Sequence, residues 1–204
     1  MLFLATVSPN ALELLKELQE LPLLENFYLV GGTALALHLG HRISVDLDFF
    51  TSEEFDTASF VNTLKEKYSI SLLAQATNSL TLDIDSVKTD FIRHNYPLIN
   101  PVLNLAGIRL ASIEDISAMK LNSTMNRGSK KDFFDIYELL KHYSLKQLLT
   151  FHFKKYDFSS QMIVLKSLIY FEDAEKEPDP VSTNSTTWQF VKTKIREEVS
   201  IFSK

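Results

Sequence analysis

The stretch that decides the fold is YLVGGTALALHLGHRISVDLDFF, from Tyr28 to Phe50. It begins with a short apolar segment, which is followed by Gly31 and Gly32 and by an apolar helical pattern that ends at Gly40. Two aspartates one residue apart come next, inside an otherwise apolar segment. This order predicts a strand, a glycine turn that opens a helix, and a second strand that carries both carboxylates.

The two carboxylates of that second strand indicate a cation site. Alternate residues of a strand point to the same side, so we expect Val45, Leu47 and Phe49 to face the core. Asp46 and Asp48 then share the opposite face, where two carboxylates repel each other unless a cation lies between them. Mg²⁺ is commonly held by carboxylates together with phosphate oxygens. The alternative is an exposed edge strand with two solvated acids.

A third carboxylate on a neighbouring strand would complete a site for two metal ions. Asp90, in the segment VKTDFI, is the best candidate because apolar residues occupy the other face of its strand. Asp83 and Asp85 show the same spacing, but they border a turn and are better explained as surface acids at the end of a hairpin.

The two glycines indicate which ligand would bind together with the cation. A strand followed by two glycines and a helix exposes backbone N–H groups at the helix N-terminus, where phosphate groups bind. Gly31 and Gly32 let the backbone approach a ligand closely, and Thr33 adds a hydroxyl. A tight turn without a ligand is the alternative. Together with the aspartates one helix later, the pattern predicts a site for a nucleoside triphosphate.

The order of the remaining elements predicts an α+β fold, with a mixed sheet and flanking helices followed by a helical bundle. Helices are expected at 8–21 and 53–68, and strands at 69–77, 79–85 and 87–94. Beyond residue 111 we expect helices at 112–127, 129–143, 144–156, 159–174 and 186–202. We therefore divide the chain into a domain of residues 1–110 and a helical domain of residues 111–204.

Composition sets further limits on the class of protein. The 204 residues are 45% hydrophobic and 23% charged, as in ordinary globular proteins, and no apolar run approaches the ~20 residues of a membrane span. Cysteine is absent and the first residues do not resemble a signal peptide, so we expect a cytoplasmic protein. The net charge of −5 argues against a nucleic-acid coat protein. Residues 1–85 carry a net charge of −8 and residues 86–204 carry +3, which would suit a metal site facing a phosphate-bearing substrate.

The segment GGTALALHLGHRISVDLDFF resembles the nucleotidyltransferase fold of the polymerase-beta type. That pattern is a Gly-Gly or Gly-Ser turn, a helix, Asp-x-Asp, and a third acid on a later strand. More narrowly, the chain looks like the AbiEii/AbiGii toxin family from about residue 26 to 142. The later segment EDISAMKLNSTMNRGSKKDFFDIYELL matches the second pair of motifs in that family: a lysine on one helix, then Arg…Lys-Asp-x-x-Asp opening the next.

This resemblance implies a role for each matching position. The catalytic residues would be Asp46, Asp48, Asp90, Lys120, Asp132 and Asp135. The acids that bind two Mg²⁺ ions would be Asp46, Asp48 and Asp90, with the position of Asp90 the least constrained. The residues that hold the nucleotide would be Gly31, Gly32, Thr33, Arg42, Ser44, Lys120 and Lys131. From the sequence alone, Asp132 and Asp135 are equally consistent with acids that favour the first turn of a helix.

The function implied by the resemblance is a Mg²⁺-dependent nucleotidyltransferase that moves a nucleoside monophosphate from a nucleoside triphosphate to an acceptor hydroxyl. In such families the acceptor can be RNA, in particular the 3′ end of tRNA, and the protein can be the toxin of a toxin–antitoxin or phage-defence pair with an antitoxin encoded nearby. The basic residues expected to hold RNA are Arg127, Lys130, Lys131, Lys141, Lys154 and Lys155, with Tyr143 and Phe153 as stacking candidates.

Three alternatives remain open from the sequence. The acceptor could be a small molecule or a protein hydroxyl, or the chain could be a non-catalytic module that binds a nucleotide and a partner. An aspartyl phosphatase also has an early DxD pattern, but such an enzyme needs no Gly-Gly helix upstream.

Overall fold

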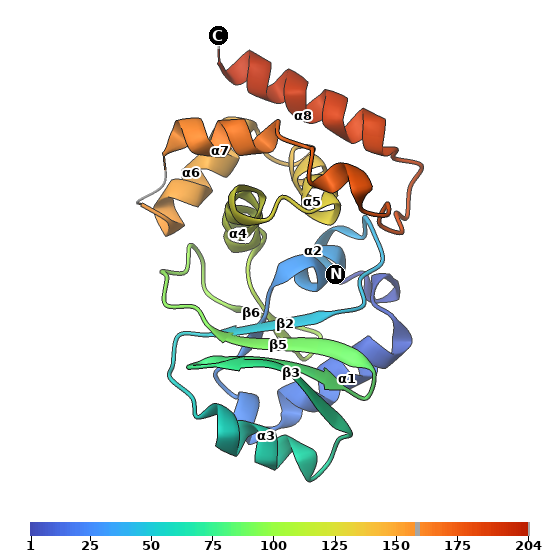
Figure 1. Ribbon diagram of the computed structural model, residues 1–204, viewed down its shortest axis with the longest axis vertical. Coiled ribbons are helices and arrows are strands. Elements are labelled where there is room, and N and C mark those ends of the chain that lie inside the picture. Colours follow the sequence, from blue (N-terminus) through green and yellow to red (C-terminus); the bar gives the residue numbers. More distant parts are fainter. Residues whose placement is uncertain (158–159, 204) are drawn as a thin grey trace.

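A seven-stranded mixed sheet forms the centre of the lower half of the molecule in the computed structural model, which describes residues 1–157 and 160–203 (Figure 1). The strands are β1 (Tyr28–Leu29), β2 (Leu47–Thr51), β3 (Ile70–Ala76), β4 (Ser79–Ile84), β5 (Val87–Arg93), β6 (Leu103–Leu105) and β7 (Ile108–Leu110). Their order is β3-β4-β5-β2-β1-β7-β6. Strand β2 lies near the centre, parallel to β5 and antiparallel to β1, and β1 runs parallel to β7.

One face of the sheet is covered by two amphipathic helices, α1 (Pro9–Glu20) and α3 (Thr57–Lys65) (Figure 1). Ser8 caps α1 by accepting a hydrogen bond from the backbone of Ala11, and Pro9 occupies the first helical position, as expected. Phe49 of β2 and Phe91 of β5 point to this side, and their rings stack 5.4 Å apart within the core. The core therefore uses one face of β2 and leaves the other face for the site.

The opposite face of the sheet meets α2 (Gly31–Leu39) and a helical layer (Figure 1). That layer contains α4 (Ile113–Asn126), α5 (Lys130–Leu139), α6 (Leu145–Lys155), α7 (Gln161–Leu168) and α8 (Trp188–Phe202). Ser112 caps α4 by accepting from the backbone of Asp115, as its position predicts. Short 3-10 helices lie at η1 (Leu4–Thr6), η2 (Pro22–Leu24) and η3 (Ala174–Lys176). No described helix combines the length and the apolar character that crossing a bilayer would require.

The expected orientation of Val45 was wrong, since this side chain is exposed. Strand β2 begins only at Leu47, because the preceding segment is held elsewhere: Ile43 N–H donates to the carbonyl of Val181 and Ser44 N–H donates to the carbonyl of Thr6. The alternation that places residues in the sheet therefore applies from Leu47 onward.

One hairpin and two helix boundaries also differ from those expected. The β6–β7 hairpin was not predicted, because each of its strands has only three residues. The helix expected at 53–68 begins at Thr57, after its N-cap Asp56. The helix expected at 159–174 is described only as Gln161–Leu168, and position 159 lies outside the described residues.

Candidate active site

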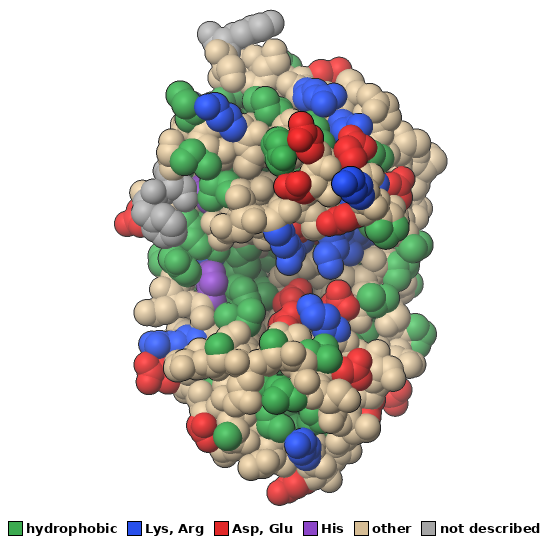
Figure 2. Space-filling model, viewed as in Figure 1, with side chains coloured by type: hydrophobic (Ala, Val, Ile, Leu, Met, Phe, Trp, Pro, Cys, Tyr) green, Lys and Arg blue, Asp and Glu red, His purple; other side chains and the backbone are tan. Residues whose placement is uncertain are grey.

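The three predicted acids line one pocket between the sheet and the helical layer. Asp48 of β2 and Asp90 of β5 are direct partners in the parallel register, and both side chains point away from the aromatic core. Asp46, Asp48 and Asp90 line this pocket together with Gly31 and Gly32. Figure 2 shows a hollow between the two halves of the molecule, where acidic and basic side chains lie next to each other. The expected neighbourhood of Asp90 and the Asp46–Asp48 pair is thus present.

The two glycines are required by the side chains that pack on them. A Cβ atom on Gly31 would lie 2.2 Å from Oδ2 of Asp48, and a Cβ atom on Gly32 would lie 2.1 Å from Nη2 of Arg42. Gly31 also has a φ angle of +69°, which L side chains rarely adopt. The turn therefore brings an acid, an arginine and the bare N-terminus of α2 into contact at one place.

Asp48 is a carboxylate in an unfavourable position. Its burial raises its pKa, and the neighbouring Asp90 raises it further, while Lys120 and Lys131 act in the opposite direction. A hard cation would relieve this repulsion, and the three carboxylates provide only oxygen donors, as Mg²⁺ prefers. The residues at this site therefore fit Mg²⁺.

The two outer carboxylates have basic partners. Oδ2 of Asp46 lies 3.6 Å from Nζ of Lys131, and Oδ2 of Asp90 accepts a hydrogen bond from Lys88 at 3.1 Å. Among the described residues, no three acidic or histidine side chains already converge on a single metal position. Binding of a cation would thus require Asp46 and Asp90 to turn away from these lysines.

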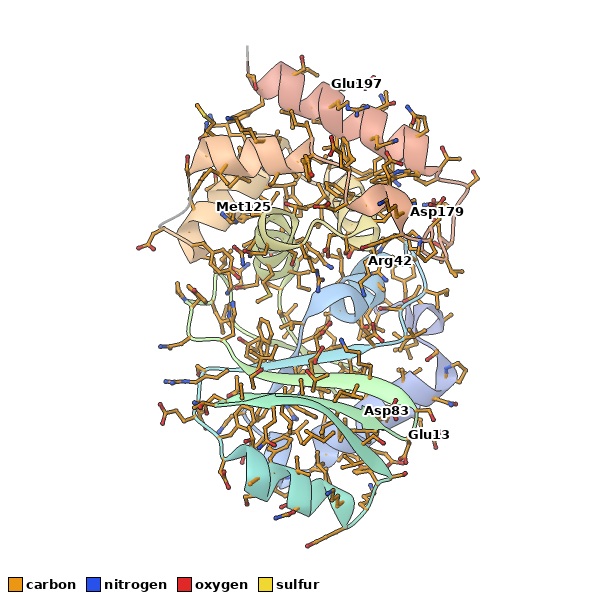
Figure 3. All side chains as sticks on the ribbon, viewed as in Figure 1. Glu13, Arg42, Asp83, Met125, Asp179 and Glu197 are labelled. Atoms are coloured by element: carbon orange, nitrogen blue, oxygen red, sulfur yellow. The ribbon has the colours of Figure 1, made fainter. Side chains whose placement is uncertain are left out.

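Behind the pocket, Asp135 of α5 holds together both halves of the molecule. Its buried carboxylate accepts from Nε of Arg42 at 2.7 Å and from Nη2 of Arg42 at 3.0 Å, and it lies 2.7 Å from Nε2 of His41. Nζ of Lys120 is a further partner at 2.7 Å. Burial opposes ionisation of Asp135, but Arg42 and Lys120 outweigh it and lower the pKa well below its usual value. Figure 3 places Arg42 near α2, where the sheet half meets the helical layer.

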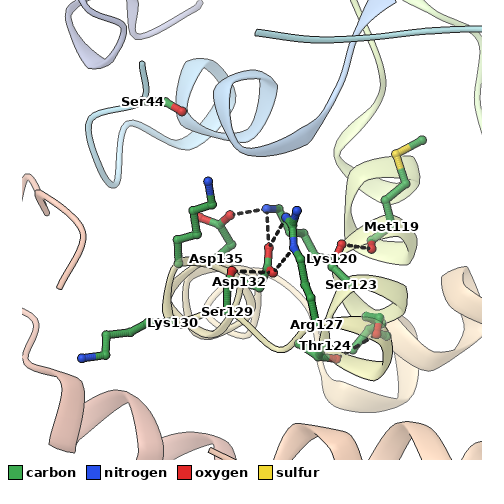
Figure 4. Close-up of polar contacts among 12 residues, drawn as sticks. Ser44, Met119, Lys120, Ser123, Thr124, Arg127, Ser129, Lys130, Asp132 and Asp135 are labelled. Atoms are coloured by element: carbon green, nitrogen blue, oxygen red, sulfur yellow. Dashed lines mark hydrogen bonds and ion pairs between the residues drawn. The ribbon is translucent and has the colours of Figure 1, made fainter. Parts of the chain in front are cut away.

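Asp132 is the second buried acid of this network. It accepts a hydrogen bond from Lys120 at 2.9 Å, from Nε of Arg127 at 2.9 Å and from the Ser129 hydroxyl at 2.7 Å. Figure 4 shows Lys120 in contact with both Asp132 and Asp135. Burial disfavours the charge of Lys120, but the two carboxylates outweigh this effect and raise its pKa, so Lys120 stays protonated at the pocket wall.

These contacts separate the expected site residues into two groups. Asp132 and Asp135 have no exposed surface and face the basic side chains behind the pocket. Thr33 is also buried: its hydroxyl donates to the carbonyl of Asp46 and lies 2.8 Å from the Ser44 hydroxyl. The sequence-based expectation that Thr33 faces the phosphates is therefore corrected, because its hydroxyl is used to hold the segment that leads into β2. The residues that do line the pocket include Arg42, Ser44, Lys120 and Lys131.

Several pocket residues were not singled out from the sequence. Phe50 and Ile92 lie two residues after Asp48 and Asp90 on the same face of their strands, and are themselves paired in the sheet. Ser123 and Arg127 follow Lys120 by three and seven residues, which is the spacing of one helix face continued past the end of α4. The strand and helix spacings, counted from the predicted site residues, would have identified all four of these residues. Lys88 and Met119 also line the pocket.

Only some residues of the basic patch proposed from the sequence are exposed. Lys130 is buried against Asp179, and Lys155 is fully buried against Asp115, so neither ammonium group is available to RNA. Lys141 is paired with Glu138, and the Tyr143 hydroxyl donates to Glu114. Phe153 packs against the hydrophobic core. Arg127 and Lys131 remain half-exposed at the pocket, and Lys154 is exposed on α6.

Comparison with known proteins gives a family and several relatives. The family model described as the nucleotidyl transferase AbiEii toxin of a type IV TA system matches residues 13–70 and 62–202. An uncharacterized protein of Aquifex aeolicus (strain VF5) is 39% identical over 193 residues, which cover 91% of this chain and 94% of that protein.

Solved structures share the fold at low sequence identity. A protein from H. pylori, assigned as a nucleotidyltransferase, superposes with a TM-score of 0.62 at 21% identity and covers 95% of both chains. MenT4, a nucleotidyltransferase toxin from Mycobacterium tuberculosis H37Rv, has a TM-score of 0.61 at 14% identity, with 96% of this chain and 86% of that chain covered. These likenesses confirm the expected fold class.

Proposed function

The chain belongs to the AbiEii family of nucleotidyl transferase toxins, and on this premise we propose that it transfers a nucleoside monophosphate from a nucleoside triphosphate to a hydroxyl of RNA, with Mg²⁺ as cofactor. The observation that carries this proposal is the meeting of Asp46, Asp48 and Asp90 with the N-terminus of α2 in one pocket. Acids, bare amides and fixed cations are the groups that phosphoryl transfer uses.

The phosphates would be bound by backbone and basic groups of this chain. Gly31 and Gly32 line the pocket, and the N–H groups at the start of a helix favour negative charge. Arg42 is held in place by Asp135 while its guanidinium lines the pocket, and Lys120 is held in the same way. Asp132 and Asp135 are positioning residues in this proposal: they fix the cations that neutralise the triphosphate.

In the reaction, the acceptor oxygen forms a bond to the α-phosphorus, and the bond from that phosphorus to the leaving pyrophosphate oxygen breaks. Two Mg²⁺ ions held by Asp46, Asp48 and Asp90 would supply Lewis-acid activation of the acceptor hydroxyl and neutralisation of the phosphates. The carboxylate of Asp90 accepts the proton that the hydroxyl loses. Lys120 and Arg42 stabilise the negative charge of the departing pyrophosphate.

The nucleobase would lie in the apolar part of the pocket. Phe50 and Ile92 form its floor on the sheet, and Met119 lines it from α4. Because Phe50 follows Asp48 by two strand positions, this floor lies about 7 Å from the acids along the strand, a suitable offset between an α-phosphate and its base.

We assign the biological context by the same reasoning from the family. The acceptor is the 3′ end of tRNA, the protein acts in the cytoplasm, and an antitoxin encoded nearby restrains it as part of phage defence. We retain a division into a nucleotidyltransferase domain of residues 1–110 and a helical domain of residues 111–204.

One assay tests the proposal. Purified protein is incubated with Mg²⁺, each of the four α-labelled nucleoside triphosphates in turn, and a tRNA pool. We expect label in the RNA, and its loss in the Asp46→Ala/Asp48→Ala variant. Asp173→Ala, at an exposed acid outside the pocket, is the matched control and should keep full activity. Label in a protein or a small molecule would move the acceptor to another class, and no transfer from any triphosphate would refute the enzyme.

A further inference from the structure

A ladder of aromatic rings leads out of the pocket, away from the three acids. It begins at Phe50, whose ring stacks on the imidazole of His94 with centroids 4.5 Å apart and planes within 18°. Tyr96 follows at 4.8 Å from His94, and Tyr156 lies 4.9 Å from Tyr96. Phe50, His94 and Tyr96 are called the aromatic ladder below.

The residues of the aromatic ladder follow Asp48 and Asp90 along the same two segments of the chain. Phe50 is two residues beyond Asp48 on β2, and His94 is four residues beyond Asp90, directly after the last residue of β5. In a strand these spacings keep side chains on one face. A ligand that starts at the acids and follows the sheet surface therefore reaches the ladder next.

The outer end of the ladder is open to solvent. The side chain of Tyr96 is 41% exposed, and Leu98 on the same loop is 40% exposed. Figure 2 shows hydrophobic side chains and a histidine on the wall of the hollow between the two halves of the molecule. Contiguous exposed apolar surface, rimmed by polar residues, is typical of a ligand or partner contact.

The loop that carries Tyr96 is held rigidly from below. The buried carboxylate of Asp115 accepts from the N–H groups of Ile99 and Asn100 at 3.0 and 3.1 Å. Nζ of Lys155 donates to this carboxylate at 2.9 Å and to the carbonyl of Pro97 at 2.8 Å. A buried ion pair thus fixes the loop, so the tyrosine ring is presented as part of a preformed surface.

The charges around the ladder favour a polyanion. Lys154 is exposed beside the loop, where its Nζ lies 3.3 Å from the carbonyl of Ile99. Arg127 and Lys131 lie at the pocket. Burial, with a further contribution from Lys155, lowers the pKa of His94 to about 4, so its ring is neutral at pH 7 and can stack as a flat aromatic ring. Rings flanked by cations are the means by which proteins bind unpaired nucleic-acid strands.

We propose that the aromatic ladder is the binding site for the unpaired bases that precede the reacting 3′ hydroxyl of an RNA acceptor. This inference rests on the proposed function for its acceptor, and it adds where the acceptor binds and in what form. A base of the acceptor stacks on Tyr96 at the outer end of the ladder, beyond the triphosphate base that Phe50 contacts in the pocket, and Lys154 contacts the backbone. The acceptor must therefore have a single-stranded 3′ end.

The test compares variants of the full chain with two RNA acceptors. One RNA has an unpaired 3′ end of several nucleotides, and the other has the same sequence annealed to a blunt duplex. We expect the unpaired RNA to be preferred. Tyr96→Ala should raise the KM for the unpaired RNA about five- to 150-fold, the effect of about 1–3 kcal/mol for one stacked base. Tyr96→Phe, which keeps the ring, should remain near the wild type, and Tyr170→Ala is the control for a similarly exposed tyrosine away from the pocket.

Abasic substitution in the RNA identifies the partner of Tyr96. Removing the base that stacks on Tyr96 should weaken the wild type by the same factor as Tyr96→Ala, and should have little further effect on that variant. Independent effects of the two changes would overturn the assignment. The circular dichroism spectrum and the affinity for the triphosphate, measured without RNA, should be the same in Tyr96→Ala as in wild type, which shows that the variant is folded.

Direct binding separates this inference from the proposed function. Fluorescence anisotropy of labelled RNA, without triphosphate, should show tighter binding of the unpaired end and its loss in Tyr96→Ala. If this dependence is seen but no nucleotide is transferred, the ladder stands and the proposed function fails. If the wild type labels RNA but Tyr96→Ala has an unchanged KM and unchanged binding, the ladder fails and the proposed function stands. Transfer only to a protein acceptor overturns the RNA assignment in both.

Discussion

Replacing Asp48 by asparagine should make the metal-free protein more stable and, at the same time, abolish its stabilisation by Mg²⁺. Most substitutions at a partly buried position of a central strand lower stability. The opposite is expected here because Asp48 is forced against Asp90 by the register of β2 and β5, and because burial removes much of the water that would screen the two charges.

The expected gain follows from the spacing of the strands. Neighbouring strands are about 4.8 Å apart, and two like charges at this distance repel by roughly 3 kcal/mol at an effective dielectric constant of about 20. Lys120 and Lys131 offset part of this repulsion. A net gain of about 1–2 kcal/mol remains, which corresponds to a rise in melting temperature of about 2–8 °C for a chain of this size.

Thermal unfolding followed by circular dichroism measures both effects. Wild type and Asp48→Asn are melted in EDTA and in increasing Mg²⁺. The wild type should gain about 2.7 kcal/mol when Mg²⁺ reaches one hundred times its dissociation constant, whereas the variant should gain little. Asp173→Asn, which changes an exposed acid outside the pocket, should behave like the wild type in both conditions.

Two results would contradict this reasoning. A lower melting temperature of Asp48→Asn in EDTA would show that its carboxylate is not under repulsion in the folded protein. An unchanged response of the variant to Mg²⁺ would show that the cation binds elsewhere.

Three further predictions concern the groups around the pocket. Gly32→Ala should weaken binding of a nucleoside triphosphate at least about tenfold in a fluorescence titration, since its Cβ atom would displace the guanidinium of Arg42. Asp135→Asn should lower the free energy of unfolding in urea by about 3–5 kcal/mol, because Arg42 and Lys120 lose their buried counter-charge; a change below 1 kcal/mol would contradict the network. His94→Gln should flatten the pH dependence of stability: with its pKa lowered to about 4, native His94 binds fewer protons than the unfolded chain between about pH 4 and 6.5, so wild-type stability rises with pH in this window. Urea unfolding at pH 5 and pH 7 measures this difference, and an equal slope in the variant would rule out His94 as its source.

The acid cluster could be predicted from sequence because its signal is local. Alternation along a strand is enough to place Asp48 on the face away from the core, and the glycine turn lies one helix upstream. Asp46 precedes β2 but lines the same pocket. The partnership of Asp48 with Asp90 is less local, since it depends on β5 pairing in parallel with β2. The apolar far side of the Asp90 segment nevertheless indicated the correct strand.

The role of Asp135 could not be predicted, because its partners are distant in the chain. Within its own helix it looks like an acid that favours the first turns. Its hydrogen-bonding partners, His41 and Arg42, are 94 and 93 residues earlier. The burial of Lys155 was missed for the same reason, since Asp115 lies forty residues before it. The spacing of residues within one helix or strand gives no information on contacts between residues so distant in the chain.

The contact between Arg42 and Asp135 has a consequence for the growing polypeptide. Translation delivers Arg42 to solvent long before helix α5 has left the ribosome, so the early product has glycines and aspartates in place but an arginine without its anchor. A prematurely terminated chain that ends before α5 therefore lacks a positioned arginine, however well its sheet has formed. The pocket thus gains its positioned arginine only after residues 130–139 have been synthesised, when about a third of the chain is still to follow.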